Sequence, residues 1–149
     1  MDAIVIISKN RGMLKNNKRL IFDQGIKDEI LNISAFRKIV IDDFSKDLFN
    51  DLELKNKVKI EKNLLGKVSL ILNKNNVFLI ENKSLKGLED KVDNLYIFTF
   101  NKNLDADFFF DADLTKFDFI KEKKIFGYKY STITLRKFSN APKIKIKVA

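Results

Sequence analysis

The run of residues 3–7, Ala-Ile-Val-Ile-Ile, limits the fold of this chain more than any other feature, because it is apolar at every position. Four of its five residues are β-branched, which favours a strand. A strand with apolar side chains on both faces must be covered on both faces, as at the centre of a parallel sheet. Other largely apolar runs predict further strands at residues 39–41, 68–72, 77–80 and 95–100. We therefore expect a layered α/β fold with helices on both faces of a sheet.

Residues 23–36 carry the clearest helical pattern. Ile26, Ile30 and Ile33 recur at spacings of three and four residues, which places them on one helix face. Asp23 precedes them and is a suitable N-cap. This segment is predicted to be a helix that begins at Asp23 and buries its isoleucines.

Other segments carry weaker signals. Residues 45–52 predict a short helix capped by Ser45, residues 84–91 predict another, and the polar residues 8–19 predict a loop. Further strands are predicted at residues 58–60, 117–120, 128–136 and 143–148. Because these late strands have no helices between them, the end of the sheet is expected to be antiparallel.

The chain has 149 residues, a formal net charge of +9, and no His, Cys or Trp. These absences exclude His-based triads, Cys nucleophiles, disulfides, and metal sites built from His or Cys. Asp105, Asp107, Asp111 and Asp113 lack the Gly and terminal Glu of a calcium loop, so no metal site is predicted.

The positive charge lies at the two ends of the chain. Residues 1–19 hold five bases and one acid, and residues 121–149 hold nine bases and one acid. This distribution is compatible with a nucleic-acid surface, or with lysines that solvate strand edges and block their pairing. The excess of Lys, 25 against four Arg, weakens the case for base-specific recognition.

The first residues do not have the pattern of a signal peptide, since Met1-Asp2 is followed by only five apolar residues. No apolar stretch reaches the length of a membrane span. A soluble, cytoplasmic protein without membrane contact is expected. Ile144, Ile146 and Val148 alternate with lysines and form an apolar strand face that can pair with a partner protein or with a second copy of the chain.

The order of these segments resembles that of the dihydrofolate reductase family. Residues 3–12 and 15–18 resemble its first strand and the loop that follows. Residues 38–41 match the second strand of the family, residues 64–67 match a Leu-Pro-Gly-Arg turn, and residues 69–72 match the strand after that turn. Residues 78–80 match the strand that precedes a diglycine. Residues 92–97 match a late strand, residues 107–111 match the acidic loop after it, and residues 128–137 match the closing strand.

The resemblance covers roughly residues 3–137 and implies the fold. It implies an α/β structure with a mixed, mostly parallel sheet of about eight strands, flanked by short helices. Residues 1–149 are expected to form a single domain of this kind. An extra C-terminal strand within residues 139–149 lies beyond the usual end of the family.

The family's substrate-site residues do not carry over to this sequence. The resemblance places Ile21 at the family's Trp and Ile26 at the acid that helps to protonate the pterin. Asp28 can replace that acid only if the helix shifts its register. The Thr that bonds the acid falls at Phe98, which offers no partner to a buried carboxyl. The substrate-binding Arg corresponds to Lys67, which keeps the charge but loses the bidentate geometry.

The family's cofactor motifs are also replaced. The Gly-Arg-x-Thr that holds the phosphates of NADPH corresponds to Asp42, Asp43, Phe44 and Ser45. The diglycine corresponds to Glu81-Asn82, where side chains obstruct the close approach of a cofactor to the backbone. Three carboxylates would therefore face a polyanion, which is unfavourable.

These substitutions lead to three functional hypotheses. The first is a degenerate member of the family that has lost NADPH and folate chemistry, needs no cofactor, and acts as a non-catalytic binding or interaction protein. The second is a divergent dihydrofolate reductase, an NADPH-dependent oxidoreductase. The third is a basic nucleic-acid-binding module.

Overall fold

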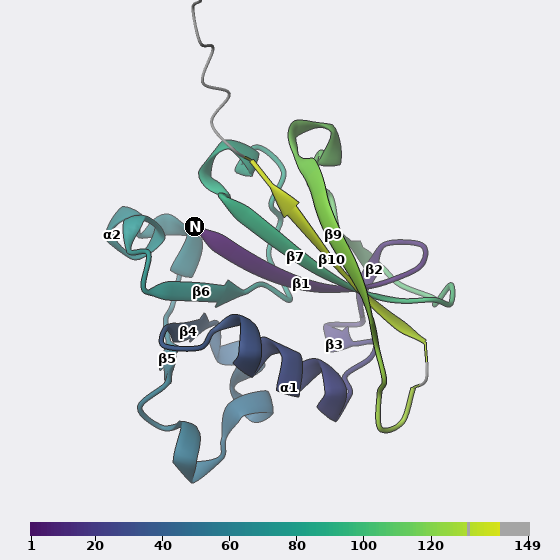
Figure 1. The fold of residues 1–149 in the computed structure, drawn as a ribbon, viewed down its shortest axis with the longest axis horizontal. Helices are drawn as coiled ribbons and strands as arrows, with labels where there is room; N and C mark the ends of the chain where they lie inside the picture. The colour runs from purple at the N-terminus through teal and green to yellow at the C-terminus, as the bar shows by residue number, and fades with distance from the viewer. Residues whose placement is uncertain (131, 141–149) are drawn as a thin grey trace, which may run out of the picture.

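The computed structural model describes residues 1–130 and 132–140, and its centre is a seven-stranded sheet (Figure 1). The strands follow one another across the sheet in the order β5 (Val58–Ile60), β4 (Lys38–Ile41), β6 (Asn76–Leu79), β1 (Asp2–Ser8), β7 (Asn94–Phe100), β10 (Ile133–Ser139) and β9 (Asp118–Ile125). The pairs from β5 to β7 are parallel, and β10 is antiparallel to both β7 and β9. The predicted mixed, mostly parallel sheet is thus confirmed.

The apolar run of β1 is central because strands lie on both of its sides. Ala3 is opposite Phe78 of β6 and Leu95 of β7, and all three side chains are fully buried. Successive residues of β1 point to opposite faces, so Val5 belongs to one apolar core and Ile4 to the other. This arrangement explains why the run tolerates no polar residue.

Helices cover both faces of the sheet, as the sequence predicts. The first core includes Leu70 and Ile71 of the short helix α2 (Val68–Leu72), and the second includes Ile26 and Ile30 of α1 (Gln24–Ile33). Asp23 is the N-cap of α1 and accepts a hydrogen bond from the amide of Gly25 at 2.7 Å. The predicted helix start is confirmed.

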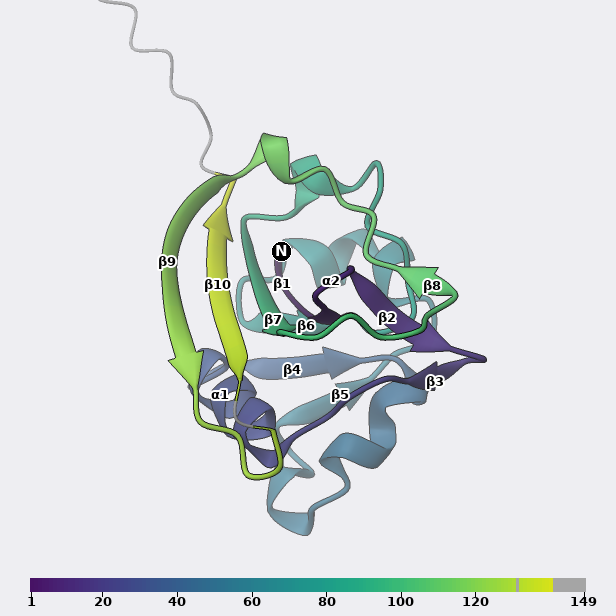
Figure 2. The same cartoon turned by 90° about the vertical axis from the view of Figure 1, so that its right-hand side faces the viewer.

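A second, three-stranded sheet forms where a loop was predicted. It has the order β3 (Lys18–Arg19), β2 (Gly12–Lys15) and β8 (Phe108–Phe109). Figure 2 shows it on the opposite side of the view from β9 and β10. The prediction of a loop over residues 8–19 was wrong because the strands are very short and their partner β8 lies about ninety residues away in sequence.

The predicted strand at residues 68–72 is instead the helix α2, so the matching of residues 69–72 to a family strand is also wrong. Val68 and Leu72 are four residues apart on the solvent side, 60% and 71% exposed, while Leu70 and Ile71 are buried. A five-residue apolar run has no period that separates a strand from a helical turn, and here the tertiary contacts favour the helix.

Two other predicted helices are mainly 3₁₀ turns. The segment expected at 45–52 is a 3₁₀ helix, η1 (Asp43–Phe49), whose N-cap is Asp42, so Ser45 is not its cap. Of residues 84–91, only η4 (Glu89–Lys91) is helical. The remaining 3₁₀ turns are η2 (Leu52–Leu54), η3 (Leu64–Gly66) and η5 (Leu114–Lys116).

The last two strands form a hairpin whose boundaries differ from the prediction. Strand β9 begins near the expected place but continues to Ile125, and β10 begins only at Ile133. Within the expected strand at 128–136, the backbone amides of residues 128–130 instead donate hydrogen bonds to Asp23. The predicted strand at 143–148 lies outside the described residues, and of the segment 139–149 only Ser139, in β10, and Asn140 are described. In the described part of the chain, no helix combines the length and the apolar character that crossing a bilayer requires.

Candidate functional site

The carboxyl ends of β1, β4 and β6 meet at one edge of the main sheet. Parallel strands carry their loops at this edge, and ligands of α/β sheets usually bind there. Asp42 follows β4 directly, Glu81 lies two residues after β6, and Ser8 ends β1. The positions that the sequence assigned to cofactor binding are therefore brought together.

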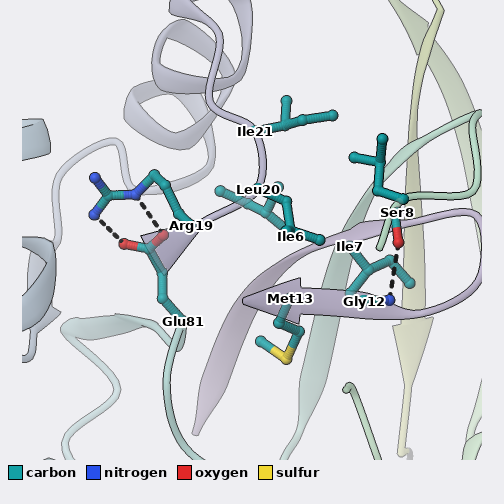
Figure 3. Close-up of a pocket in the computed structure, with 10 residues that line it drawn as sticks. Ile6, Ile7, Ser8, Gly12, Met13, Arg19, Leu20, Ile21 and Glu81 are labelled. Atoms are coloured by element: carbon teal, nitrogen blue, oxygen red, sulfur yellow. Dashed lines mark hydrogen bonds and ion pairs between the residues drawn. The ribbon is translucent and has the colours of Figure 1, made fainter. Parts of the chain in front are cut away.

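The centre of this edge is an ion pair between Arg19 of β3 and Glu81 (Figure 3). The Arg19 guanidinium donates two hydrogen bonds to the carboxylate, from Nε to Oε2 and from Nη2 to Oε1, both 2.9 Å long. The Glu81 side chain is only 4% exposed and that of Arg19 19% exposed. Bidentate geometry and low exposure make this pair much stronger than an ordinary surface ion pair.

Three groups of η1 complete the arrangement around Arg19. Asp47 accepts a hydrogen bond from Nη1 at 2.7 Å, and the ring of Phe44 lies 5.3 Å from the guanidinium carbon. The buried Ser45 donates its hydroxyl to Oε1 of Glu81 at 2.7 Å. We refer to Arg19, Glu81, Ser45 and Asp47 as the Arg19 clamp.

The contacts of the clamp shift the pKa values of Arg19 and Asp47. The hydrogen bond from Arg19 holds the pKa of the Asp47 carboxyl below its usual value. Burial alone would lower the pKa of Arg19, but the bonds and charges of Glu81 and Asp47 raise it overall. Arg19 and Asp47 therefore stay charged across the physiological pH range. The clamp ties β3, η1 and the end of β6 together.

The remaining polar groups at this edge surround Asp42, whose carboxylate lies 3.9 Å from the ammonium of Lys83. Asp42 accepts from the amide of Phe44 at 3.0 Å and from the side chain of Asn82 at 3.3 Å. Among the residues that the structure describes, Asn82 Oδ1 is buried without a donor. Asp43 is exposed and pairs with Lys46 at 3.3 Å.

The space beside the clamp is almost completely filled. A cavity of about 10 Å³ remains between the strand ends and β2, which is room for about one water molecule. Pockets for organic ligands have volumes of roughly 300 Å³ or more. The lining residues are Ile6, Ile7, Ser8, Gly12, Met13, Arg19, Leu20, Ile21, Glu81 and Leu104, and nearly all of them appear in Figure 3.

The backbone of β2 closes this space from the side. The amide of Gly12 donates to Ser8 Oγ at 2.9 Å. A Cβ at Gly12 would lie 2.7 Å from the Cβ of Ala106 and 2.8 Å from Ser8 Oγ, so no side chain is tolerated there. The small sheet is therefore packed directly onto the end of β1.

The three apolar residues of the expected substrate site lie together in the second core. Ile21 is 9% exposed and lines the small cavity, while Ile26 and Phe98 are 1% and 0% exposed. Phe98 is opposite Ile6 of β1 and Leu135 of β10. The three side chains themselves have no titratable group, and their role in the described structure is packing.

Asp28 and Lys67 lie elsewhere. Asp28 is half-buried on α1, where it accepts hydrogen bonds from Gln24 at 2.9 Å and from the hydroxyl of Tyr128 at 3.2 Å, and it does not line the cavity. Lys67 is exposed and pairs with Glu61, beyond the end of β5, at 2.7 Å. The structure does not bring either residue to the clamp.

Asp23 has a second role that the sequence does not reveal. Besides capping α1, its carboxylate accepts hydrogen bonds from the amides of Tyr128, Lys129 and Tyr130 at 2.8–3.0 Å. Burial alone would raise the pKa of Asp23, but these backbone hydrogen bonds lower it overall. The buried carboxylate thereby fixes the turn between β9 and β10 against the start of α1.

Comparison with known proteins supports the fold. No protein-family model and no curated protein sequence matches the chain. Among solved structures, it is similar to a dihydrofolate reductase from Enterococcus faecalis complexed with NADP(H) and RAB-propyl, with a TM-score of 0.68 at 14% identity. The match covers 95% of this chain and 97% of that chain. The protein therefore has a dihydrofolate-reductase-like fold.

The chemistry of the strand-end edge differs from what a dinucleotide needs. A diphosphate requires hydrogen-bond donors and positive charge. Asp42 and Glu81 are carboxylates, and the nearby guanidinium of Arg19 is already bound to Glu81 and Asp47. Within residues 1–130 and 132–140, no three carboxylates are grouped in a way that could hold a metal ion.

Proposed function

We propose that this protein is a dihydrofolate-reductase-like scaffold that has lost NADPH and folate chemistry and acts through binding, as a non-catalytic interaction protein. The observation that carries the proposal is the Arg19 clamp. Its Glu81 carboxylate occupies the position that the resemblance assigns to a cofactor-contacting glycine, and its guanidinium has no free edge for a phosphate.

The substrate side gives independent support. The resemblance assigns Ile26 and Phe98 to the positions of the family's acid and its hydroxyl partner, and both side chains are buried among apolar residues. Protonation of a bound heterocycle needs a titratable group within hydrogen-bond reach, and neither side chain supplies one. Loss of both chemistries at once is expected when selection no longer acts on reduction.

Titration with NADPH tests the proposal. Protein fluorescence and thermal stability are followed as NADPH is added, and dihydrofolate-dependent oxidation of NADPH is measured in parallel. The Enterococcus faecalis enzyme serves as the positive control. We expect no saturable binding and no turnover, because the anion would meet carboxylates. Saturable NADPH binding with turnover of dihydrofolate would refute the proposal.

A divergent NADPH-dependent reductase is the second candidate. The observation that favours it is the extent of the structural likeness, since the NADP(H)-bound enzyme matches over 95% of this chain. This candidate requires the clamp to open and Asp28 or another carboxyl to reach the substrate. The same titration decides between the two candidates.

A further inference from the structure

We propose that the groove between α1 and the β9–β10 hairpin binds single-stranded nucleic acid without sequence preference. The inference names a partner class for the proposed interaction role and rests on that role, but it does not depend on the state of the cofactor edge. The groove is lined by residues other than those of the Arg19 clamp.

The groove has a volume of about 290 Å³ and is open to solvent. Residues of α1 line one side of it, and residues of β7, β9 and β10 line the other. Figure 1 shows α1 beside the antiparallel end of the sheet. Its lining residues are Glu29, Asn32, Ile33, Tyr96, Lys121, Lys123, Leu135 and Lys137.

The groove carries a surplus of positive charge. Lys121, Lys123 and Lys137 line it, and Glu29 is its single acid. Glu29 is paired with Lys123 at 2.7 Å. Lys121 forms no ion pair with any residue of 1–130 or 132–140, and the ammonium of Lys137 lies 5.6 Å from the ring centre of Tyr96. A chain of phosphates along the groove would meet these two ammonium groups.

Three other acids lie near the groove. Glu122 of β9 accepts a hydrogen bond from Arg136 at 2.7 Å. Asp28 is bonded to the uncharged Gln24 and Tyr128, and Asp118 is exposed at the start of β9; neither is paired with a cation of residues 1–130 or 132–140. The residues that line the groove itself, three lysines and one glutamate, carry a net charge of +2.

Exposed aromatic rings occur in the turn of the hairpin whose strands line the groove. Phe126 and Tyr128, in the turn of the hairpin, are 89% and 76% exposed. Rings of this size are normally covered, and stacking on unpaired bases is a use that fits an aromatic side chain beside a basic groove. Tyr96 supplies a further aromatic ring within the groove itself.

The turn is held in place before any ligand arrives. The carboxylate of Asp23 binds the amides of residues 128–130, and the hydroxyl of Tyr128 donates to Asp28 on α1 at 3.2 Å. A fixed turn loses little entropy on binding. The turn that carries the rings is thus fixed to α1, which lines the groove.

The prevalence of Lys over Arg agrees with this kind of binding. Lys acts as a point charge toward phosphate, whereas Arg provides the bidentate recognition of guanine. All three basic residues that line the groove are lysines. The expected ligand is therefore a flexible single strand, recognised by its phosphates and by base stacking.

Fluorescence anisotropy with a labelled oligothymidine tests the proposal. We expect saturable binding to the full-length protein that weakens steeply with salt. The double variant Lys121→Gln/Lys137→Gln should lower the affinity about tenfold and reduce the salt slope by about two. The matched control is Lys55→Gln/Lys62→Gln, which removes the same charge from exposed positions elsewhere. It should change the affinity less than about twofold.

The aromatic contribution is tested separately with Phe126→Ala and Tyr128→Ala, each expected to weaken binding about fivefold or more. Phe36→Ala, at a fully exposed ring outside the groove, is the control. Equal losses in the groove and control variants would overturn the assignment of the site. Absence of binding, equal binding to a DNA duplex, or equal competition by polyglutamate would overturn the choice of ligand. None of these results affects the outcome of the NADPH titration. The nucleic-acid proposal and the proposed loss of NADPH chemistry can therefore each be refuted without the other.

Discussion

Replacement of Arg19 by Met gives the most informative test of the clamp. The substitution keeps an apolar stem that reaches as far as the position of Nε but leaves the Glu81 carboxylate, 4% exposed, without its cation. Removing one partner of a buried ion pair typically costs roughly 3–5 kcal/mol. The lower end applies here, about 3 kcal/mol, because Arg19 is partly exposed and Ser45 still donates to Glu81. For a chain of this size, that loss lowers the melting temperature by roughly 6–12 °C.

The double variant Arg19→Met/Glu81→Leu removes the unpaired charge as well. Its free energy of unfolding should lie about 1–2 kcal/mol below that of the parent and above that of Arg19→Met, because an apolar pair can replace a buried ion pair but the buried Ser45 hydroxyl loses its acceptor. Urea denaturation of the parent, both single variants and the double variant gives the coupling energy directly. Lys46→Met is the surface control, since its pair with Asp43 is exposed on both sides and should contribute less than about 1 kcal/mol.

A loss below about 1 kcal/mol in Arg19→Met would contradict this account. So would a double variant that is as unstable as the single one. Either result would mean that the carboxylate of Glu81 is solvated in solution and that the edge of the sheet is open.

Three further predictions follow from the contacts of Asp23 and of the hairpin turn. Asp23→Ala removes the α1 cap and the acceptor of three other amides, and should destabilise the protein by about 2–4 kcal/mol in urea denaturation. A loss of less than about 0.5 kcal/mol, which is typical of a surface substitution, would contradict the anchoring role of Asp23. Because the folded-state pKa of Asp23 is lowered, its contribution is present above its unfolded pKa of about 3.9 and is lost as the pH falls through the folded value. Denaturation curves from neutral to acid pH should therefore show that Asp23→Ala loses less stability on acidification than the parent protein does. An equal loss of stability in both proteins would contradict this prediction. In Gly127→Ala the new Cβ would collide with the carbonyl oxygen of Tyr130, so a loss of about 1–3 kcal/mol is expected, and an unchanged midpoint would show that the turn adapts.

Much of the fold can be predicted from the sequence because its apolar runs are long or regular. The run of β1, the isoleucines of α1 and the cap at Asp23 each have a local physical signal, and each appears where expected. The five residues of α2 and the short strands of the small sheet have no such signal. Their conformation depends on contacts with residues that are distant in sequence.

The candidate site was only partly predictable. The strand-end positions Asp42 and Glu81 were found from the resemblance, but the clamp was missed because Arg19 was placed in a loop. One signal was available. Arg19 is one of only four arginines in a chain with 25 lysines, and Arg is preferred where a carboxylate must be held in bidentate geometry. Sequence alone could not show that its partner is Glu81, sixty-two residues away.

A crystal structure of the protein crystallised with NADPH and a folate analogue is the most direct test of the central claim, that the scaffold no longer binds these ligands. We predict that Arg19 remains bound to Glu81, that the space between Ile7 and Ile21 stays as small as it is in the free protein, and that no nucleotide lies beside Asp42. A dinucleotide between Asp42 and Asn82, with the guanidinium turned away from Glu81, would contradict the account.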